Sequence, residues 1–300
     1  MITPLRASTP TRTPAEFEAL VQDIRPELHR YCARMIGSVV DAEDVVQDAL
    51  AKAYAALPTT AIANMRGWLF RIAHNKAIDH LRRANHQRME YLDEYALLAD
   101  PDPPLAEREM VALALSVFLQ LAPQQRSCVI LKDVLGYSLA DISELLDTTV
   151  PAIKAALHRG RTRLRELAPR VTVDGTTPLD AQERELLARY IAHFNARDFD
   201  AVRAMLADEV RLDLISRTTR QGRAAVGEYF QRYDQVDDWQ LALGAVEHRP
   251  AILVYDPRAP SSQPTYFILL AWDGAQVACI RDYRYVPYVM RDAELDQGVR

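Results

Sequence analysis

Positive charge gathers between residues 149 and 170, where six Arg or Lys accompany one acidic residue. Ile153, Leu157 and Leu164 recur there at helical spacing, which assigns them to the apolar side of a helix. Basic side chains pair with DNA phosphates and with guanine edges in the major groove. The pattern therefore indicates a DNA contact, and a helix bundle with a solvated basic face is the alternative. The side chains that cover much of the remaining surface of this helix are Lys154, His158, Arg159, Arg161, Arg163 and Arg165.

A second basic stretch, residues 64–88, also holds six Arg or Lys against one acidic residue. Trp68, Leu69 and Ile72 begin the apolar positions of a helix here, and a loop precedes it. A basic helix beside a loop suits single-stranded or partly melted nucleic acid. The alternative is an ordinary solvated helix that Trp68 packs in place. The charged side chains of this helix include Arg71 and Lys76, and Asn75 lies between them.

Helices must present these side chains, and capping residues predict where the helices lie. Pro123 opens a helix that Gly136 stops. Ser138 and Asp141 form a variant capping box for a short second helix, and Pro151 falls in the first turn of the basic helix. A short helix, a tight turn and a basic helix make a helix-turn-helix, whose second helix can enter a DNA major groove.

Three amphipathic helices are predicted ahead of this motif. The first covers residues 17–35. The second, residues 41–57, begins at Asp41, with Asp44 closing an acidic variant of the capping box, and ends before Pro58. The third carries the basic stretch described above. The polar outer face of the second helix holds Asp44, Gln47 and Asp48.

The chain has 300 residues and a net charge of −5, an average that conceals the basic stretches. Its three cysteines, Cys32, Cys128 and Cys279, are far apart and odd in number, which argues against a disulfide framework and against a Cys-rich zinc site. The sequence contains no signal peptide and no apolar run long enough to span a membrane. We therefore predict a soluble cytoplasmic protein with no metal ion, no cofactor and no membrane partner.

The sequence predicts a multidomain protein in which two all-α modules are followed by an α+β domain. Acidic and Pro-rich stretches mark the linkers. The predicted parts are a flexible N-terminus at 1–14, a helical module at 15–88, a linker at 89–106, a helix-turn-helix module at 107–168, a second linker at 169–178, the α+β domain at 179–288 and a tail at 289–300.

The α+β domain is predicted from an alternation of helical and strand patterns. Two helices come first, and the second is capped by Asp198 and reaches Leu206. A strand, a third helix and a meander of four strands follow. Asp273 and Gly274 form a hairpin turn, and the last strand covers residues 276–289.

The two helical modules, in this order and with this linker, resemble bacterial sigma factors of the extracytoplasmic-function group. DAEDVVQDALAKAY is similar to the family's polymerase-binding helix, and GWLFRIAHNKAIDHLRR to the segment that melts and reads the minus-ten promoter element. The run from Leu121 to Leu167 is similar to the module that reads the minus-thirty-five element. The resemblance covers about residues 15–168. It implies that the protein recruits core RNA polymerase to particular promoters and is not itself a catalyst.

The resemblance assigns roles position by position. Those that match the helix docking on the clamp coiled coil of the largest polymerase subunit are Asp44, Gln47 and Asp48. Asn75 matches a position that contacts a flipped minus-ten base, with Arg71 and Lys76 beside it. The groove-facing positions of the recognition helix are Lys154, His158, Arg159 and Arg161. Two departures are the short loop at 58–64 and Ala155, which stands where small hydroxyl residues are frequent in the family.

The C-terminal domain resembles the SnoaL-like domains of the NTF2-like superfamily, in which a curved sheet wraps round helices and leaves a pocket in the cone. The resemblance covers about residues 180–288 and includes the run from Leu186 to Leu214. It implies a built-in regulator whose pocket can take a small ligand. Isomerases of the superfamily use an Asp or His as general base. The candidates here form no motif and are interpreted as surface or satisfied polar residues: Asp213, His193, His248 and Asp282.

The leading hypothesis is a transcription initiation factor with an in-chain regulatory domain. Its partners are core RNA polymerase, promoter DNA, and either a separate anti-sigma factor or a small ligand at the C-terminal domain. One alternative is a helix-turn-helix repressor or activator that is not a polymerase subunit, although such a protein has no use for the acidic docking helix. The other alternative is a SnoaL-type enzyme or ligand sensor fused to a DNA-binding regulator.

Overall fold

The computed structural model describes residues 14–60, 62, 64–86, 115–167, 181–259 and 263–297. The chain divides into two compact units, Met1–Thr172 and Val173–Arg300. The predicted linkers lie outside the described residues. The sequence also predicts a helix over residues 107–121, of which 107–114 lie outside the described residues. The predicted fold class, two all-α modules followed by an α+β domain, is confirmed.

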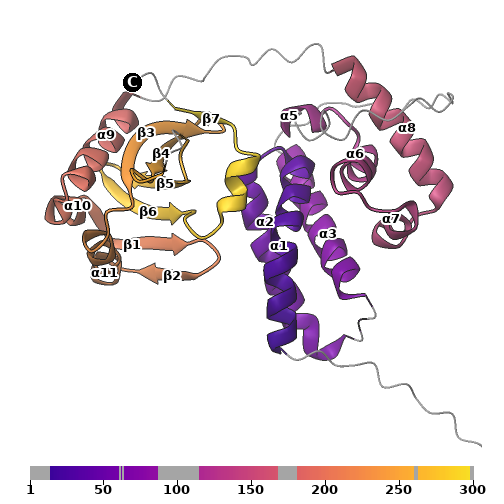
Figure 1. The fold of residues 1–300 in the computed structure, drawn as a ribbon, viewed down its shortest axis with the longest axis horizontal. Helices are drawn as coiled ribbons and strands as arrows, with labels where there is room; N and C mark the ends of the chain where they lie inside the picture. Colours follow the sequence, from indigo (N-terminus) through magenta and orange to yellow (C-terminus); the bar gives the residue numbers. More distant parts are fainter. Residues whose placement is uncertain are drawn as a thin grey trace, which may run out of the picture. The chain divides into compact units, whose positions relative to one another are not determined.

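The N-terminal unit is helical throughout its described part (Figure 1). Its two predicted modules, α1 to α3 and α5 to α8, pack against each other within the unit. The elements are α1 (Pro14–Ile36), α2 (Val39–Ala56), a 3-10 turn (Leu57–Thr59), α3 (Met65–His86), α5 (Leu115–Phe118), α6 (Pro123–Val129), its π-helical continuation (Ile130–Val134), α7 (Leu139–Leu146) and α8 (Val150–Leu167).

Helix α2 begins two residues before the predicted start. The side chain of Ser38 is the N-cap and accepts a hydrogen bond from the backbone N–H of Asp41 at 3.1 Å. Asp41 therefore lies in the first turn, where a carboxylate is favoured by the helix dipole. The prediction of a cap at Asp41 closed by Asp44 was wrong, because Ser38, in extended backbone three residues earlier, caps the helix and places Asp41 inside its first turn.

The helix-turn-helix forms as predicted. The Ser138 hydroxyl accepts from the backbone N–H of Asp141 at 3.1 Å, and the Ser138 N–H donates to the Asp141 carboxylate at 3.1 Å, which completes the capping box. Helix α8 can approach α6 closely because it carries Gly160, where an added Cβ would lie 2.7 Å from a methyl group of Val129. Ile153 of α8 is fully buried.

The C-terminal unit is one seven-stranded sheet in the order β2-β1-β6-β5-β4-β3-β7, with three helices along one side of it (Figure 1). Strand β1 runs parallel to β6, and the other neighbours are antiparallel. The helices are α9 (Ala181–Asn195), α10 (Phe199–Ala204) and α11 (Arg223–Asp234). The strands are β1 (Leu206–Leu214), β2 (Thr218–Gln221), β3 (Gln240–Val246), β4 (Arg249–Tyr255), β5 (Tyr266–Asp273), β6 (Gln276–Asp282) and β7 (Leu295–Asp296).

Three predictions for this unit need correction. Leu206 begins β1 instead of ending a helix, because the backbone carbonyl of Met205 already accepts from Val277 on the neighbouring strand. Strands β2 and β7 were not predicted, and β7, which pairs with β3, lies within the stretch predicted as a tail. The last long strand ends at Asp282 instead of residue 289, because the chain turns there: the carbonyl of Tyr283 accepts from the backbone N–H of Val286 at 3.1 Å, and Pro287 then opens a 3-10 turn.

The core of this unit lies between the three helices and the sheet. Phe194 of α9 is its centre, with ring centroids 5.3 Å from Phe199, 5.9 Å from Phe230, 5.2 Å from Tyr233 and 5.0 Å from Trp239. These pairs pack edge to face, the arrangement that the ring quadrupole favours. The aromatic cluster therefore holds the helices at a fixed distance from the sheet.

Candidate nucleic-acid interface

Helix α3 presents the candidate minus-ten contacts. Its start is fixed by Asn64, whose side-chain oxygen accepts from the backbone N–H of Gly67 at 2.9 Å. Asn75 is exposed, as is Arg71 one turn earlier on the same face. The Arg71 guanidinium donates to the backbone carbonyl of Glu144 in α7 at 2.7 Å. One candidate DNA contact is thus already bonded to the helix-turn-helix module.

Helix α2 carries the candidate polymerase contacts. Asp44 and Asp48 are exposed, and Gln47 is half-buried with its amide 3.5 Å from the Glu43 carboxylate. Asp48 also pairs with Lys76 of α3 at 3.3 Å. The structure therefore joins one residue from each of two predicted sites, although an exposed pair of this kind contributes little to stability.

The carboxylate of Glu43 is the charged group in this region that sequence reasoning missed. Glu43 is fully buried and pairs with Arg25 of α1. Its neighbours Asp41 and Asp44 lie on the polar side of the helix, but Glu43 falls on the apolar stripe with Ala42 and Val46. That helical position is the signal that distinguishes a structural carboxylate from a docking one.

The recognition helix α8 separates its four candidate contacts by exposure. Lys154 is exposed, and His158 and Arg159 are half-buried. Arg161 donates from Nε and Nη2 to the two carboxylate oxygens of Asp133, at 2.9 and 2.6 Å. That bidentate pairing raises the pKa of Arg161 and leaves 18 % of its side chain exposed. Arg161 is therefore held against its own module rather than presented to solvent.

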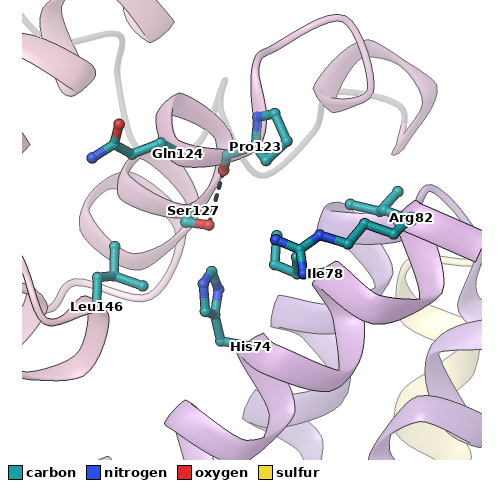
Figure 2. A pocket seen from close by; sticks show the side chains of 8 residues that line it. His74, Ile78, Arg82, Pro123, Gln124, Ser127 and Leu146 are labelled. Atoms are coloured by element: carbon teal, nitrogen blue, oxygen red, sulfur yellow. Dashed lines mark hydrogen bonds between the residues drawn. The ribbon is translucent and has the colours of Figure 1, made fainter. Parts of the chain in front are cut away.

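A cavity of about 370 Å³ opens between α3 and the helix-turn-helix module. Figure 2 shows that α3 contributes His74, Ile78 and Arg82, and that the opposite wall holds Pro123, Ser127 and other side chains of α6 and α7. The ring of His74 is bonded through Nδ1 to the hydroxyl of Tyr31 at 2.7 Å. Burial lowers the pKa of His74 below its ordinary value.

Asp282, interpreted from the sequence as a surface or satisfied polar residue, is fully buried and hydrogen-bonded in the C-terminal unit. Its Oδ2 accepts from the hydroxyls of Tyr229 at 2.6 Å and Tyr233 at 3.1 Å, and its Oδ1 accepts from the backbone N–H of Arg284 at 2.8 Å. Burial raises the pKa of Asp282, and these donors oppose the shift. The group borders a cavity of about 160 Å³ that Leu214 also lines.

The other general-base candidates do not meet Asp282. Asp213 precedes Leu214, which pairs with Asp282 across β1 and β6, so strand alternation puts Asp213 on the opposite face of the sheet. His193 lies on α9 beside Asp198 at 3.5 Å, and His248 is exposed in the turn between β3 and β4. The structure thus brings no second candidate to the cavity that Asp282 borders.

Membrane-spanning helices and metal-binding clusters are two further features that the described part of the chain can be checked for. Among those residues, none of the helices is long and apolar enough to cross a membrane. The same residues contain no cluster of three or more His, Cys, Asp or Glu that could hold a metal ion.

Comparison with known families gives three matches along the chain. Residues 20–87 match Sigma-70 region 2, residues 112–164 match Sigma-70 region 4, and residues 187–263 match the SnoaL-like domain. The first two matches contain the helices that carry the candidate polymerase and DNA contacts. The third contains α11 and the first strands of the C-terminal sheet.

Individual relatives agree with these matches. The ECF RNA polymerase sigma factor SigG of Mycobacterium tuberculosis is 32% identical over 212 residues, which cover 62% of this chain and 57% of SigG. The chain thus spans little more than half the length of that relative. The ECF RNA polymerase sigma factor SigW of Bacillus subtilis is 32% identical over 164 residues, covering 50% of this chain and 87% of SigW.

Among solved structures, the crystal structure of the M. tuberculosis extracytoplasmic function sigma factor SigJ aligns with 93% of this chain and 99% of its own, at 22% identity and a TM-score of 0.35. The sequence matches carry the assignment, since SigW is covered over most of its length and both sigma regions occur in order. The chain belongs to the extracytoplasmic-function (ECF) RNA polymerase sigma factors and carries a SnoaL-like domain after its two sigma regions.

Proposed function

We propose that this chain binds core RNA polymerase and directs it to specific promoters. Helix α2 docks on the polymerase through Asp44 and Asp48, α3 captures a melted minus-ten base with Asn75, and α8 reads the minus-thirty-five element with Lys154. The observation that carries the proposal is the order of the two sigma regions over helices whose proposed contact residues are exposed. A factor with this function acts in the cytoplasm, as the sequence predicts.

Two linked binding measurements test the proposal. The full chain should co-purify with core RNA polymerase, and the two together should enrich particular sequences from a random DNA library. A helix-turn-helix repressor would enrich DNA without polymerase and would not bind the core enzyme. Enrichment of the same sequences by the chain alone, with no polymerase binding, would therefore favour that alternative.

The SnoaL-like domain is proposed to regulate the sigma regions rather than to catalyse a reaction. The cavity beside Asp282 favours a sensor for a ligand of only a few atoms, because its volume of about 160 Å³ is below the usual range of drug-sized sites and its lining combines Leu214 and Val236 with fixed polar groups. Against catalysis, Asp282 already accepts three hydrogen bonds, and the other general-base candidates lie away from it.

A truncation tests this part of the proposal. Ending the chain before Pro178 should change transcription from the enriched promoters, in either direction, while polymerase binding is kept. Equal transcription by the truncated and full-length chains, across several promoters and salt concentrations, would show that the domain does not regulate the sigma regions. Turnover of a substrate by the full chain that is lost in Asp282→Asn would instead support the enzyme alternative.

A further inference from the structure

The two DNA-reading modules of the N-terminal unit meet through a specific, buried contact. Arg126 of α6 is 5 % exposed. Its guanidinium donates to the backbone carbonyl of Met35 at the end of α1, and to the carbonyls of Leu119 at 3.0 Å and Leu121 at 2.8 Å. The three carbonyl acceptors favour this geometry of the guanidinium, because losing any of them would leave a further buried donor unsatisfied beside Nε, which has no hydrogen-bond partner.

Aromatic and polar contacts extend this interface along α3. The ring of Phe70 packs edge to face on Tyr137, with centroids 5.3 Å apart. The Tyr137 hydroxyl accepts from Nε of Arg66 at 3.1 Å, and Arg71 donates to Glu144 as described above. The contact is therefore continuous from the end of α1 to the start of α3, and it engages α3 on a face that also carries candidate DNA contacts.

The cavity in Figure 2 exists only while the modules touch, because its walls come from both of them. Its volume of about 370 Å³ lies in the range of small-molecule sites. Any molecule that fills it contacts both modules at once. We call the arrangement in which the two modules touch closed, and the one in which they do not touch separated. Such a molecule binds only the closed arrangement, so it shifts the equilibrium toward that arrangement by its whole binding free energy.

The lining indicates the chemical class of that molecule. Ile78, Leu81 and Leu146 provide aliphatic walls. Arg82 lines the cavity with most of its side chain in solvent, and its guanidinium lies 3.9 Å from the exposed carboxylate of Asp79, a long surface pairing that a bound anion can replace. None of the described lining residues is acidic. An apolar body is favoured by the walls, and an anionic head is favoured by the guanidinium, which binds carboxylates through paired hydrogen bonds.

We propose that this cavity is a regulatory site for a small amphiphilic organic anion, such as an aliphatic carboxylate, which holds the two DNA-reading modules together. The consequence for promoter binding follows from size, and this part of the inference rests on the proposed function. Elements at minus ten and minus thirty-five lie roughly 25 base pairs, or about 85 Å, apart along B-form DNA. A compact unit of this length is only about 40 Å across. The closed arrangement cannot occupy both elements, so the anion acts against initiation.

Binding is tested first, with octanoate as the probe and the full-length chain. Octanol and octylammonium have the same tail with a neutral and a cationic head. Octanoate should bind most tightly in a calorimetric or NMR titration below its micellar concentration, octanol more weakly and octylammonium weakest. Absence of octanoate binding, or equal binding of all three compounds, overturns the site.

Two neighbouring arginines provide a matched control for the head-group contact. Arg82 lines the cavity, and Arg83 is exposed on the same helix without lining it. Arg82→Gln should weaken octanoate binding by about five- to tenfold and leave octanol binding unchanged, whereas Arg83→Gln should change neither. Leu146→Trp, whose larger side chain fills the aliphatic end of the cavity, should weaken the binding of both octanoate and octanol. Equal effects of the two arginine variants would show non-specific attraction to a basic helix and would overturn the assignment.

The regulatory part is tested separately, so that its failure is distinguishable from failure of the proposed function. Octanoate should lower transcription by the complex of the chain with core polymerase, and Leu146→Trp should remove that sensitivity. A fluorescence distance between labels on α3 and α8 should also report fewer separated molecules when octanoate is bound. Octanoate binding with unchanged distance and unchanged transcription overturns the regulatory role. Absence of transcription without octanoate refutes instead the function on which that role rests.

Discussion

Arg161 binds both carboxylate oxygens of Asp133 through Nε and Nη2, so a residue predicted to contact DNA is held within its own module. Arg161→Ala should lower the free energy of unfolding by about 1–3 kcal/mol, because it leaves a largely buried carboxylate without its partner. Asp133→Asn should act in the same direction, although Asp133 is not a candidate DNA contact. Chemical denaturation checks both values. Normal stability of Arg161→Ala, with weaker binding to every promoter, would restore its predicted role as a DNA contact and would assign that contact to phosphate.

Lys154 should behave differently from Arg161, because it is exposed on the recognition helix. Lys154→Ala should leave stability within about 0.5 kcal/mol of the original. At the base pair that it reads, the preference should fall by about 1–3 kcal/mol. Binding competition among promoter variants measures this preference. A uniform loss on all variants would make Lys154 a phosphate contact instead.

Polymerase docking should depend on the charge of α2. The double variant Asp44→Lys with Asp48→Lys should weaken binding to core polymerase by about tenfold or more, since it replaces two exposed carboxylates with like charges facing a basic partner. A control with the same change in net charge is Glu18→Lys with Glu144→Lys, at exposed positions on other helices. If both double variants lose binding equally, net charge rather than the α2 face controls docking.

Asn75 should act in promoter opening rather than in duplex binding. Its amide can donate to and accept from the edge of an unstacked base, and the structure leaves the side chain exposed on α3. Asn75→Ala should leave binding to a duplex minus-thirty-five element near normal and reduce transcription, even on a template with a pre-melted bubble. Asp79→Ala, one turn further on the same face, is the control. Normal transcription by Asn75→Ala would remove this residue from the site.

Local chemistry in the sequence was enough to predict the capping box at Ser138 and the cap at Asp198, because each involves residues three apart in the chain. The role of Arg126 could not be predicted in this way. It follows Gln125 in a helix that reads as amphipathic, and its acceptor at Met35 lies in another helix 91 residues away. In the sequence, Arg126 is simply one more basic residue, and nothing there indicates its contact with Met35.

The same limit applies in the C-terminal domain. Asp273 and Gly274 mark the β5–β6 turn by their own conformational preferences, and Gly274 has a φ of 57°. The burial of Asp282 depends instead on hydroxyls from α11, 53 and 49 residues earlier in the chain. The sequence of a strand does not show which face of the sheet will offer hydrogen-bond donors to a polar side chain. That Asp282 is hydrogen-bonded was therefore only one of two interpretations, and its full burial was not predicted.

Acid should destabilise the N-terminal unit through His74. Burial lowers the pKa of His74 in the folded protein, whereas in the unfolded chain the pKa keeps its ordinary value of about 6.5. As the pH falls below this value, the unfolded chain therefore takes up the proton before the folded protein does. The free energy of unfolding decreases as a result. Between about pH 8 and pH 5.5, the original protein should lose more stability than His74→Gln. His80→Gln controls for the same substitution on α3. A parallel decline for the original protein and His74→Gln would exclude this histidine as a cause.

Transcription by purified core polymerase on an enriched promoter tests the central claim most directly. Three templates are compared: the intact promoter, one with the minus-ten element scrambled and one with the minus-thirty-five element scrambled. We expect a defined transcript that requires this chain and falls at least about tenfold when either element is scrambled. No chain-dependent transcript from the intact promoter, with folded protein bound to active core polymerase, would contradict it.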